Sequence, residues 1–113
     1  MPTIAHNIGQ LRHYITIQEE TATARNDYNE TTETWGTLTD GQIWARVESL
    51  AGQELIEARQ VHGNVSHKVT ARWLDGVERQ MRVVHDGRVF NIESVLNVEE
   101  RDWIMVIYAT EAV

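Results

Sequence analysis

Alternating apolar and polar residues along much of the chain predict short strands. The apolar side chains of Leu11–Gln18 fall on one face of an extended chain, which is the pattern of a half-buried strand. The same alternation predicts strands over Gly41–Leu50 and Val65–Trp73. Trp103–Ala109 is apolar on both faces, so we expect either a central strand or a strand whose outer face meets a partner.

Met81–Val95 predicts a tight antiparallel hairpin. Its two apolar runs flank Asp86 and Gly87. This dipeptide suits a two-residue type I′ turn, because both central residues of that turn need a positive φ and Asp and Gly tolerate it.

Gly52–His62 predicts the one helix. Leu55, Ala58 and Val61 recur at intervals of three, and Gly63 stands where a left-handed C-terminal cap is expected. A helix of this length is marginal alone, so we expect it to pack on the rest of the domain.

The alternation stops between Glu19 and Asp40, in a segment rich in Thr, Glu, Asn and Gly. This segment is too long for an ordinary connection, so we expect a long loop that is functional or partly disordered, with strand ends at most near Glu33–Trp35. The predicted fold is mainly β: a small antiparallel β-barrel or sandwich of about six strands with one short α-helix and a long polar loop. We expect a single domain over residues 1–113, with an N-terminal arm over residues 1–10 and the long loop over residues 19–40.

Charge and composition narrow the class of function. The formal net charge is −7, with 17 acidic and 10 basic residues, which argues against a protein that holds nucleic acid by its phosphates. The chain has no cysteine, so it has neither disulfides nor thiolate chemistry, and this is compatible with assembly in a reducing cytoplasm. No apolar run is long enough for a transmembrane helix, and Met1–Gln10 lacks the pattern of a signal peptide.

The residues capable of chemistry show no catalytic pattern. His62 and His67 straddle Gly63, a spacing that does not place two ligands on one helical face. The paired carboxylates fall in predicted loops or on the helix surface, and no nucleophile motif or phosphate-binding loop is present. We therefore predict no catalytic, cofactor-binding or metal-binding residue and no enzyme. His13 and His67 lie on apolar strand faces and are expected to be structural, and the four tryptophans are expected mainly in the core.

Residues spread in order along the chain carry a family resemblance. They are Leu11-Arg12-His13, Ile15-Thr16-Ile17-Gln18, Asp27-Tyr28-Asn29-Glu30, Thr34-Trp35, Trp44-Ala45, Val47, Gly52, Glu54, Ala58, His67, Arg72, Met81-Arg82-Val83, Gly87-Arg88, Phe90, Ile92, Ser94-Val95 and Glu100-Arg101. In this order and spacing the chain resembles the phage head–tail joining proteins, also called head-closure or stopper proteins, of long-tailed phages. The resemblance covers roughly Ile8 to Tyr108. Asn29 departs from it, since many relatives have Gly there, but Asn also accepts a left-handed conformation.

The resemblance implies a structural virion protein. Such proteins form a ring, commonly of twelve copies, beneath the portal and its adaptor, where they close the packaged head and provide the surface on which the tail docks. The long loop would reach into the channel, with these candidate gate residues: Arg25, Asp27, Tyr28, Asn29 and Glu30. The apolar last strand and the tryptophans suggest a subunit or partner interface, with these candidates: Trp35, Trp103, Met105 and Ile107.

The resemblance also implies the protein's partners and location. The partners are further copies of the chain, a portal or adaptor protein above and a tail or tail-completion protein below, without a cofactor or a membrane. Twelve copies at −7 each would carry −84, so DNA would pass without specific binding. The location would be the virion, after assembly in the host cytoplasm. Two alternatives stay open: another connector or tail-completion ring protein, or a small β-barrel ligand-binding module or enzyme.

Overall fold

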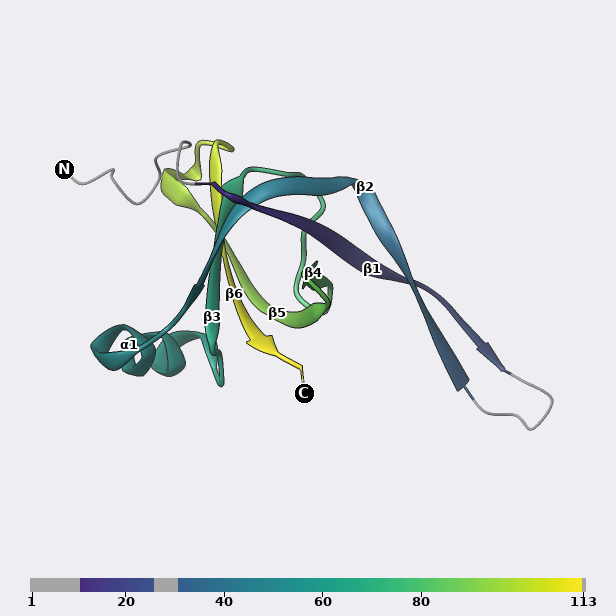
Figure 1. The fold of residues 1–113 in the computed structure, drawn as a ribbon, viewed down its shortest axis with the longest axis horizontal. Coiled ribbons are helices and arrows are strands. Elements are labelled where there is room, and N and C mark those ends of the chain that lie inside the picture. Colours follow the sequence, from purple (N-terminus) through teal and green to yellow (C-terminus); the bar gives the residue numbers. More distant parts are fainter. Residues whose placement is uncertain (1–10, 26–30, 113) are drawn as a thin grey trace.

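The fold is a closed antiparallel β-barrel with a long hairpin projecting from it (Figure 1). The computed structural model describes residues 11–25 and 31–112. Within these ranges the elements are β1 (His13–Arg25), β2 (Thr31–Ser49), α1 (Gly52–His62), β3 (His67–Arg72), β4 (Arg82–His85), β5 (Arg88–Asn97), the 3₁₀-helix η3 (Val98–Glu100) and β6 (Ile104–Glu111). The order around the barrel is β1-β2-β3-β6-β5-β4, and β4 pairs with β1 to close it. The predicted mainly β fold is confirmed, and of the two architectures the barrel is correct.

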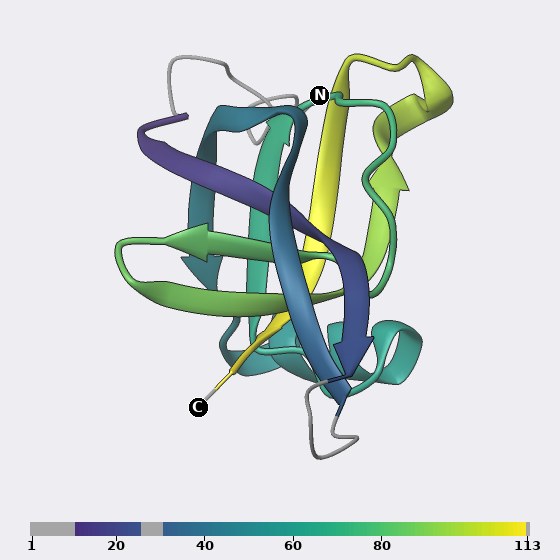
Figure 2. The same cartoon turned by 90° about the vertical axis from the view of Figure 1, so that its right-hand side faces the viewer.

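The strands surround a closed interior (Figure 2). Inward-facing residues of every strand fill it. Alternation places Ile15 and Ile17 of β1 inside, and both are fully buried. The other buried core members are Leu38, Ala45, Val69, Ala71, Val83, Phe90, Ile92, Met105, Ile107 and Ala109. These apolar side chains supply the burial that stabilises a domain of this size.

Of the two possibilities that the sequence left open for the last strand, β6 is a central strand. It pairs with β3 on one side and β5 on the other, and four consecutive residues, Ile104–Ile107, are buried. Met105 and Ile107 face the core and are fully buried, so their prediction as interface residues is wrong. A run that is apolar on both faces reflects here a strand covered on both faces within one chain.

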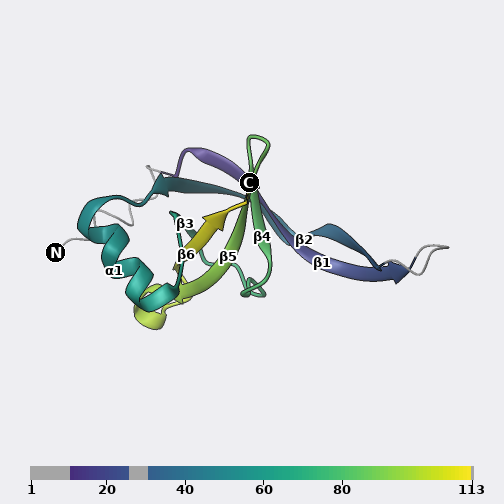
Figure 3. The same cartoon turned by 90° about the horizontal axis from the view of Figure 1, so that it is seen from below.

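Helix α1 lies outside the barrel at one end (Figure 3) and has the predicted bounds. Leu55 and Ala58 pack in a small second cluster with Leu50, Val65 and Tyr108. Of the three apolar residues that recur along the predicted helix, Val61 does not pack on the barrel, because it is 77% exposed. Gly63 has a positive φ of 85° but a ψ of −152°, so the predicted left-handed cap is wrong.

The hairpin β4–β5 is confirmed. Its two turn residues, Asp86 and Gly87, have φ values of 51° and 78°, and His85 pairs with Arg88 across the turn. Both central residues therefore have the positive φ that a type I′ turn needs.

The prediction of a long loop between Glu19 and Asp40 is wrong over its described part. β1 and β2 pair continuously along it, out to Arg25↔Thr31. We call the part beyond the barrel, Glu19–Arg25 and Thr31–Gly36, the extension. Both faces of a projecting two-stranded ribbon can meet solvent, so its residues need not alternate and its sequence looks like a loop. The N-terminal arm (residues 1–10) and the four gate candidates in residues 26–30 lie outside the described residues.

Candidate functional site

The extension leaves the barrel where β2 contains extra residues that break the register of its pairing with β1. Thr16 pairs with Gln42 but Gln18 pairs with Thr37, so Ile17 alone on β1 stands opposite four residues of β2, Leu38–Gly41. Such an insertion bends the strand that carries it. The bend turns β2 from the barrel wall into the extension.

Two residues hold this bend in place. Leu38 is only 9% exposed and joins the barrel core, which anchors the base of the extension. A Cβ on Gly41 would lie 2.7 Å from the carbonyl oxygen of Leu38 and 2.9 Å from that of Ile17. The two backbones therefore approach so closely that only glycine fits at position 41.

A polar contact ties the extension to β4. The guanidinium carbon of Arg82 lies 4.2 Å from the centroid of the Trp35 ring, and its Nε donates a hydrogen bond of 2.7 Å to Oε1 of Gln18. Trp35 is half-buried in this contact. The predicted interface candidate Trp35 thus has a partner within its own chain, which leaves its role between chains as a proposal.

The segment that contains the extension holds most of the net charge. Residues 19–40 include six carboxylates and one arginine, a net charge of −5 out of the chain's −7. The gate candidate Arg25, the one basic residue among them, is the last residue of β1. The negative charge of the sequence is therefore concentrated between residues 19 and 40, and the remaining residues have a net charge of only −2.

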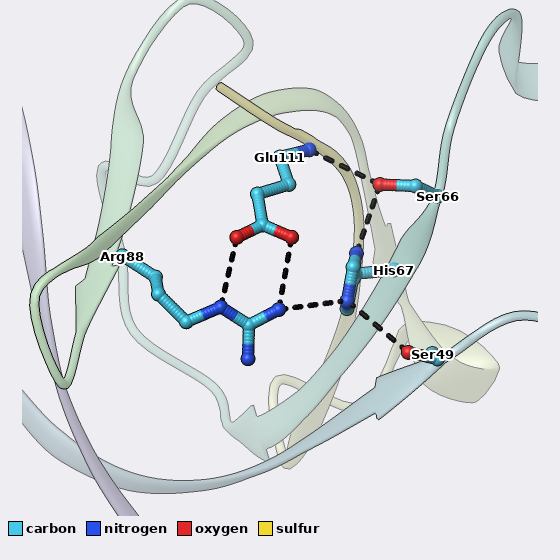
Figure 4. A network of polar contacts seen from close by, with 5 residues as sticks. All are labelled: Ser49, Ser66, His67, Arg88 and Glu111. Atoms are coloured by element: carbon cyan, nitrogen blue, oxygen red, sulfur yellow. Dashed lines mark hydrogen bonds and ion pairs between the residues drawn. The ribbon is translucent and has the colours of Figure 1, made fainter. Parts of the chain in front are cut away.

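A polar network that is partly exposed to solvent joins neighbouring strands at one end of the barrel (Figure 4). Arg88 on β5 makes a two-bond ion pair with Glu111 on β6, with Nε–Oε2 and Nη2–Oε1 distances of 2.8 and 2.9 Å. His67 on β3 lies beside it, with its Nδ1 2.8 Å from Oγ of Ser66 and its Nε2 3.3 Å from Oγ of Ser49. The network joins four strands, so it fastens the barrel wall where the apolar core ends.

Burial sets the protonation of His67. His67 is 8% exposed as a residue, and desolvation lowers the pKa of its imidazole below the usual value of 6.5. The charge of Arg88 lowers the pKa further, while the charge of Glu111 opposes both effects. A neutral imidazole bonded to two serine hydroxyls is consistent with the structural role predicted for His67.

His13 and His85 lie side by side in the barrel wall. Their ring centroids are 4.9 Å apart in an edge-to-face arrangement, and Nδ1 of His13 accepts a hydrogen bond from the backbone N–H of Val47. Among the described residues, no group of three or more His, Asp or Glu side chains is arranged to hold a metal ion. Nor does any described helix have the length and hydrophobicity to cross a bilayer.

The tryptophans do not fill the core as predicted. Trp44 is 57% exposed and Trp103 is 44% exposed, while Trp35 and Trp73 are half-buried. The exposed Tyr14–Trp44 pair was missed, although the alternation already assigned both residues to the polar faces of their strands.

The comparison with protein families decides the identity of the chain. The family description "phage head completion protein" matches residues 6–112, nearly the whole sequence. The chain belongs to this family. The predicted resemblance to the head-closure proteins of phages is therefore confirmed, and the role of this head completion protein is a structural one in the virion.

Solved structures share the fold of this head completion protein. It is similar to protein SF1141 from Shigella flexneri 2a, known from a solution structure, with a TM-score of 0.72 and 27% identity over 95% of this chain and 97% of that one. It is also similar in fold to a chain of the virion of a native gene transfer agent particle, with a TM-score of 0.56 and 17% identity over 91% of this chain and 96% of that one. A comparison with curated proteins gives no match.

Proposed function

We propose that this head completion protein forms a ring in the head–tail connector, where it closes the packaged head and provides the surface on which the tail docks. The observation that carries the proposal is the family match over residues 6–112. The ring would consist of twelve copies and would lie between a portal or adaptor protein above and a tail or tail-completion protein below.

The extension suits a position at the channel. It projects from a closed barrel, and the segment that contains it has a net charge of −5. Carboxylates repel DNA phosphates, so an acidic projection can line or obstruct a channel without binding the genome that passes. We propose that Arg25, Asp27, Tyr28, Asn29 and Glu30 form the gate, and that the ring assembles in the host cytoplasm.

Particles made without the protein test this function. We expect electron micrographs of such a lysate to show heads that package DNA and then lose it, beside separate, finished tails. Supplying the protein in trans should restore joined, filled particles. Heads that stay filled beside unfinished tails would contradict head closure and would instead support a tail-completion protein.

A further inference from the structure

An exposed face of the barrel has no covering element among the described residues. Tyr14 on β1 pairs in register with Trp44 on β2, their ring centroids are 5.1 Å apart, and they are 50% and 57% exposed. Large aromatic side chains that stand together in solvent are typical of an interaction surface.

The same face is basic. Ala45 pairs with Ala71, so the next position along places Arg72 on β3 beside Trp44, and Arg72 is exposed. Arg12 and Arg46 line one hollow on this side of the barrel, together with Glu48, whose carboxylate lies 3.2 Å from the Arg46 guanidinium. We call these five residues, Arg12, Tyr14, Trp44, Arg46 and Arg72, the basic aromatic face.

The face has a groove that can receive a chain. The groove has a volume of about 630 Å³, and its lining residues are Leu11, Gln42, Ile43, Trp44 and Arg72. Arg72 is its one charged lining residue, and the rest of the lining is mainly apolar. The groove therefore suits an extended segment with apolar or small side chains and nearby negative charge.

We propose that the basic aromatic face binds the acidic extension of a second copy of this chain. Charge complementarity carries the proposal. Arg12 and Arg72 are exposed on this face, while the extension holds Glu19, Glu20 and Glu33 against Arg25, a net charge of −2. The extension is also a two-stranded ribbon with little support of its own, and docking on a neighbour stabilises such a ribbon.

The extension cannot reach the basic aromatic face of its own chain, so the contact must form between two copies. Tyr14 precedes Glu19 by five residues on the same strand, and the extension leads away from the barrel, so it cannot fold back onto its own face (Figure 1). A projection on one side and its receptor on another give a head-to-tail contact, which closes into a ring when the rotation allows. In this respect the inference rests on the proposed ring.

Charge-reversal variants test the contact. The face variant is Arg12→Glu with Arg72→Glu, and the extension variant is Glu19→Lys with Glu20→Lys. Sedimentation velocity over a concentration series should show self-association of the wild type that weakens with salt, and each variant should weaken it by roughly tenfold or more. A matched control, Arg59→Glu with Arg101→Glu, makes the same change of charge at exposed arginines on α1 and after η3, outside both the face and the extension, and should associate like the wild type.

Mixing gives the decisive result. Each variant alone has a face and an extension of the same charge, but in a 1:1 mixture every face again meets an extension of opposite charge. The mixture should therefore regain association, in assemblies in which the two variants alternate. A chain with all four substitutions should regain self-association. Circular dichroism of each variant verifies the fold.

Three results would overturn the inference. They are a wild type that stays monomeric at the highest concentrations, a face variant that associates like the wild type, and a face variant that loses only the binding of a short single-stranded DNA. The particle experiment is separate. Heads that leak without the protein, together with a failed charge swap, would leave head closure standing and place the contact elsewhere. A successful charge swap, together with heads that stay closed without the protein, would support the contact between copies and contradict head closure.

Discussion

Among the glycines that the structure describes, Gly41 is the one at which an added side chain would meet the closest atoms. An added methyl group would meet two carbonyl oxygens at 2.7 and 2.9 Å, and backbone atoms cannot move away as a flexible side chain can. We expect Gly41→Ala to lower the free energy of unfolding by about 1–3 kcal/mol. Urea denaturation followed by circular dichroism measures this.

A neighbouring substitution supplies the control for Gly41. Thr39 is exposed in the same bend, so Thr39→Ala should change the free energy of unfolding by less than about 0.5 kcal/mol. Equal effects of the two substitutions would show that the close approach of the backbones is not what position 41 requires.

His67 should make the stability of the barrel depend on pH. Burial lowers the pKa of His67 in the folded state, so the unfolded chain binds the proton more readily. Its contribution is fully present above the unfolded value of about 6.5 and is lost as pH falls from there through the folded pKa. His67→Gln should flatten the decline in unfolding free energy measured between neutral and mildly acidic pH, and an unchanged slope would contradict this.

Glu111 acts in a lower range of pH. The hydrogen bond from Arg88 lowers the pKa of Glu111 below its usual 4.5. The stability it contributes is therefore present above about 4.5 and lost below it, so the two effects separate along one pH titration.

At the scale of elements, the position of α1 depends on a small contact. Ala58 is its one buried residue, and the cluster around it holds only a few apolar side chains. Ala58→Glu would bury a charge without a partner, so we expect a loss of about 2–4 kcal/mol in unfolding free energy. Thermal unfolding followed by circular dichroism measures it.

Gln60→Glu is the matched change on the same helix. Gln60 is exposed, so the new carboxylate stays in water and the melting temperature should remain close to that of the wild type. If Gln60→Glu destabilised the protein as much as Ala58→Glu, added acidity rather than packing would be the cause.

At the scale of the whole molecule, the barrel and the extension should be separable. Glu20 pairs with Trp35, so a two-residue Asn-Gly turn can join them in place of residues 21–34. The core lies entirely outside the removed residues, so we expect an unfolding free energy within about 1 kcal/mol of the wild type. Chemical denaturation measures this.

The shortened protein also tests the proposed gate. It keeps Glu19 and Glu20, the proposed contact residues of the extension, but lacks Arg25, Asp27, Tyr28, Asn29 and Glu30. Particles made with it should therefore join tails but fail to retain DNA in electron micrographs. Normally filled particles would show that the extension is not needed for closure, even if the ring forms.

Parts of this molecule followed from local sequence. The bounds of α1 and the turn at Asp86 and Gly87 were predictable, because helix punctuation and a type I′ turn depend on neighbouring residues alone. The strands of the barrel were predictable because one face of each is buried, which imposes alternation along the chain.

The exposed candidates were less predictable. Trp103 looks like a core residue by type, and only the structure shows that it is exposed to solvent. Met105 and Ile107 look like possible contact residues, and only the pairing of β6 on both sides shows that they fill the core.

The sequence by itself therefore determined the β class, the helix, the tight hairpin and the family, since each of these is written in short-range pattern or in the order of residues. The tertiary structure decided that the sheet closes into a barrel and that Glu19–Asp40 is a paired ribbon bent at Gly41. It also brought Arg12, Trp44 and Arg72 onto one face. The physical reason is that strand pairing and close backbone approach join residues far apart in the chain. Such contacts produce no repeating pattern among neighbouring residues from which they could be predicted.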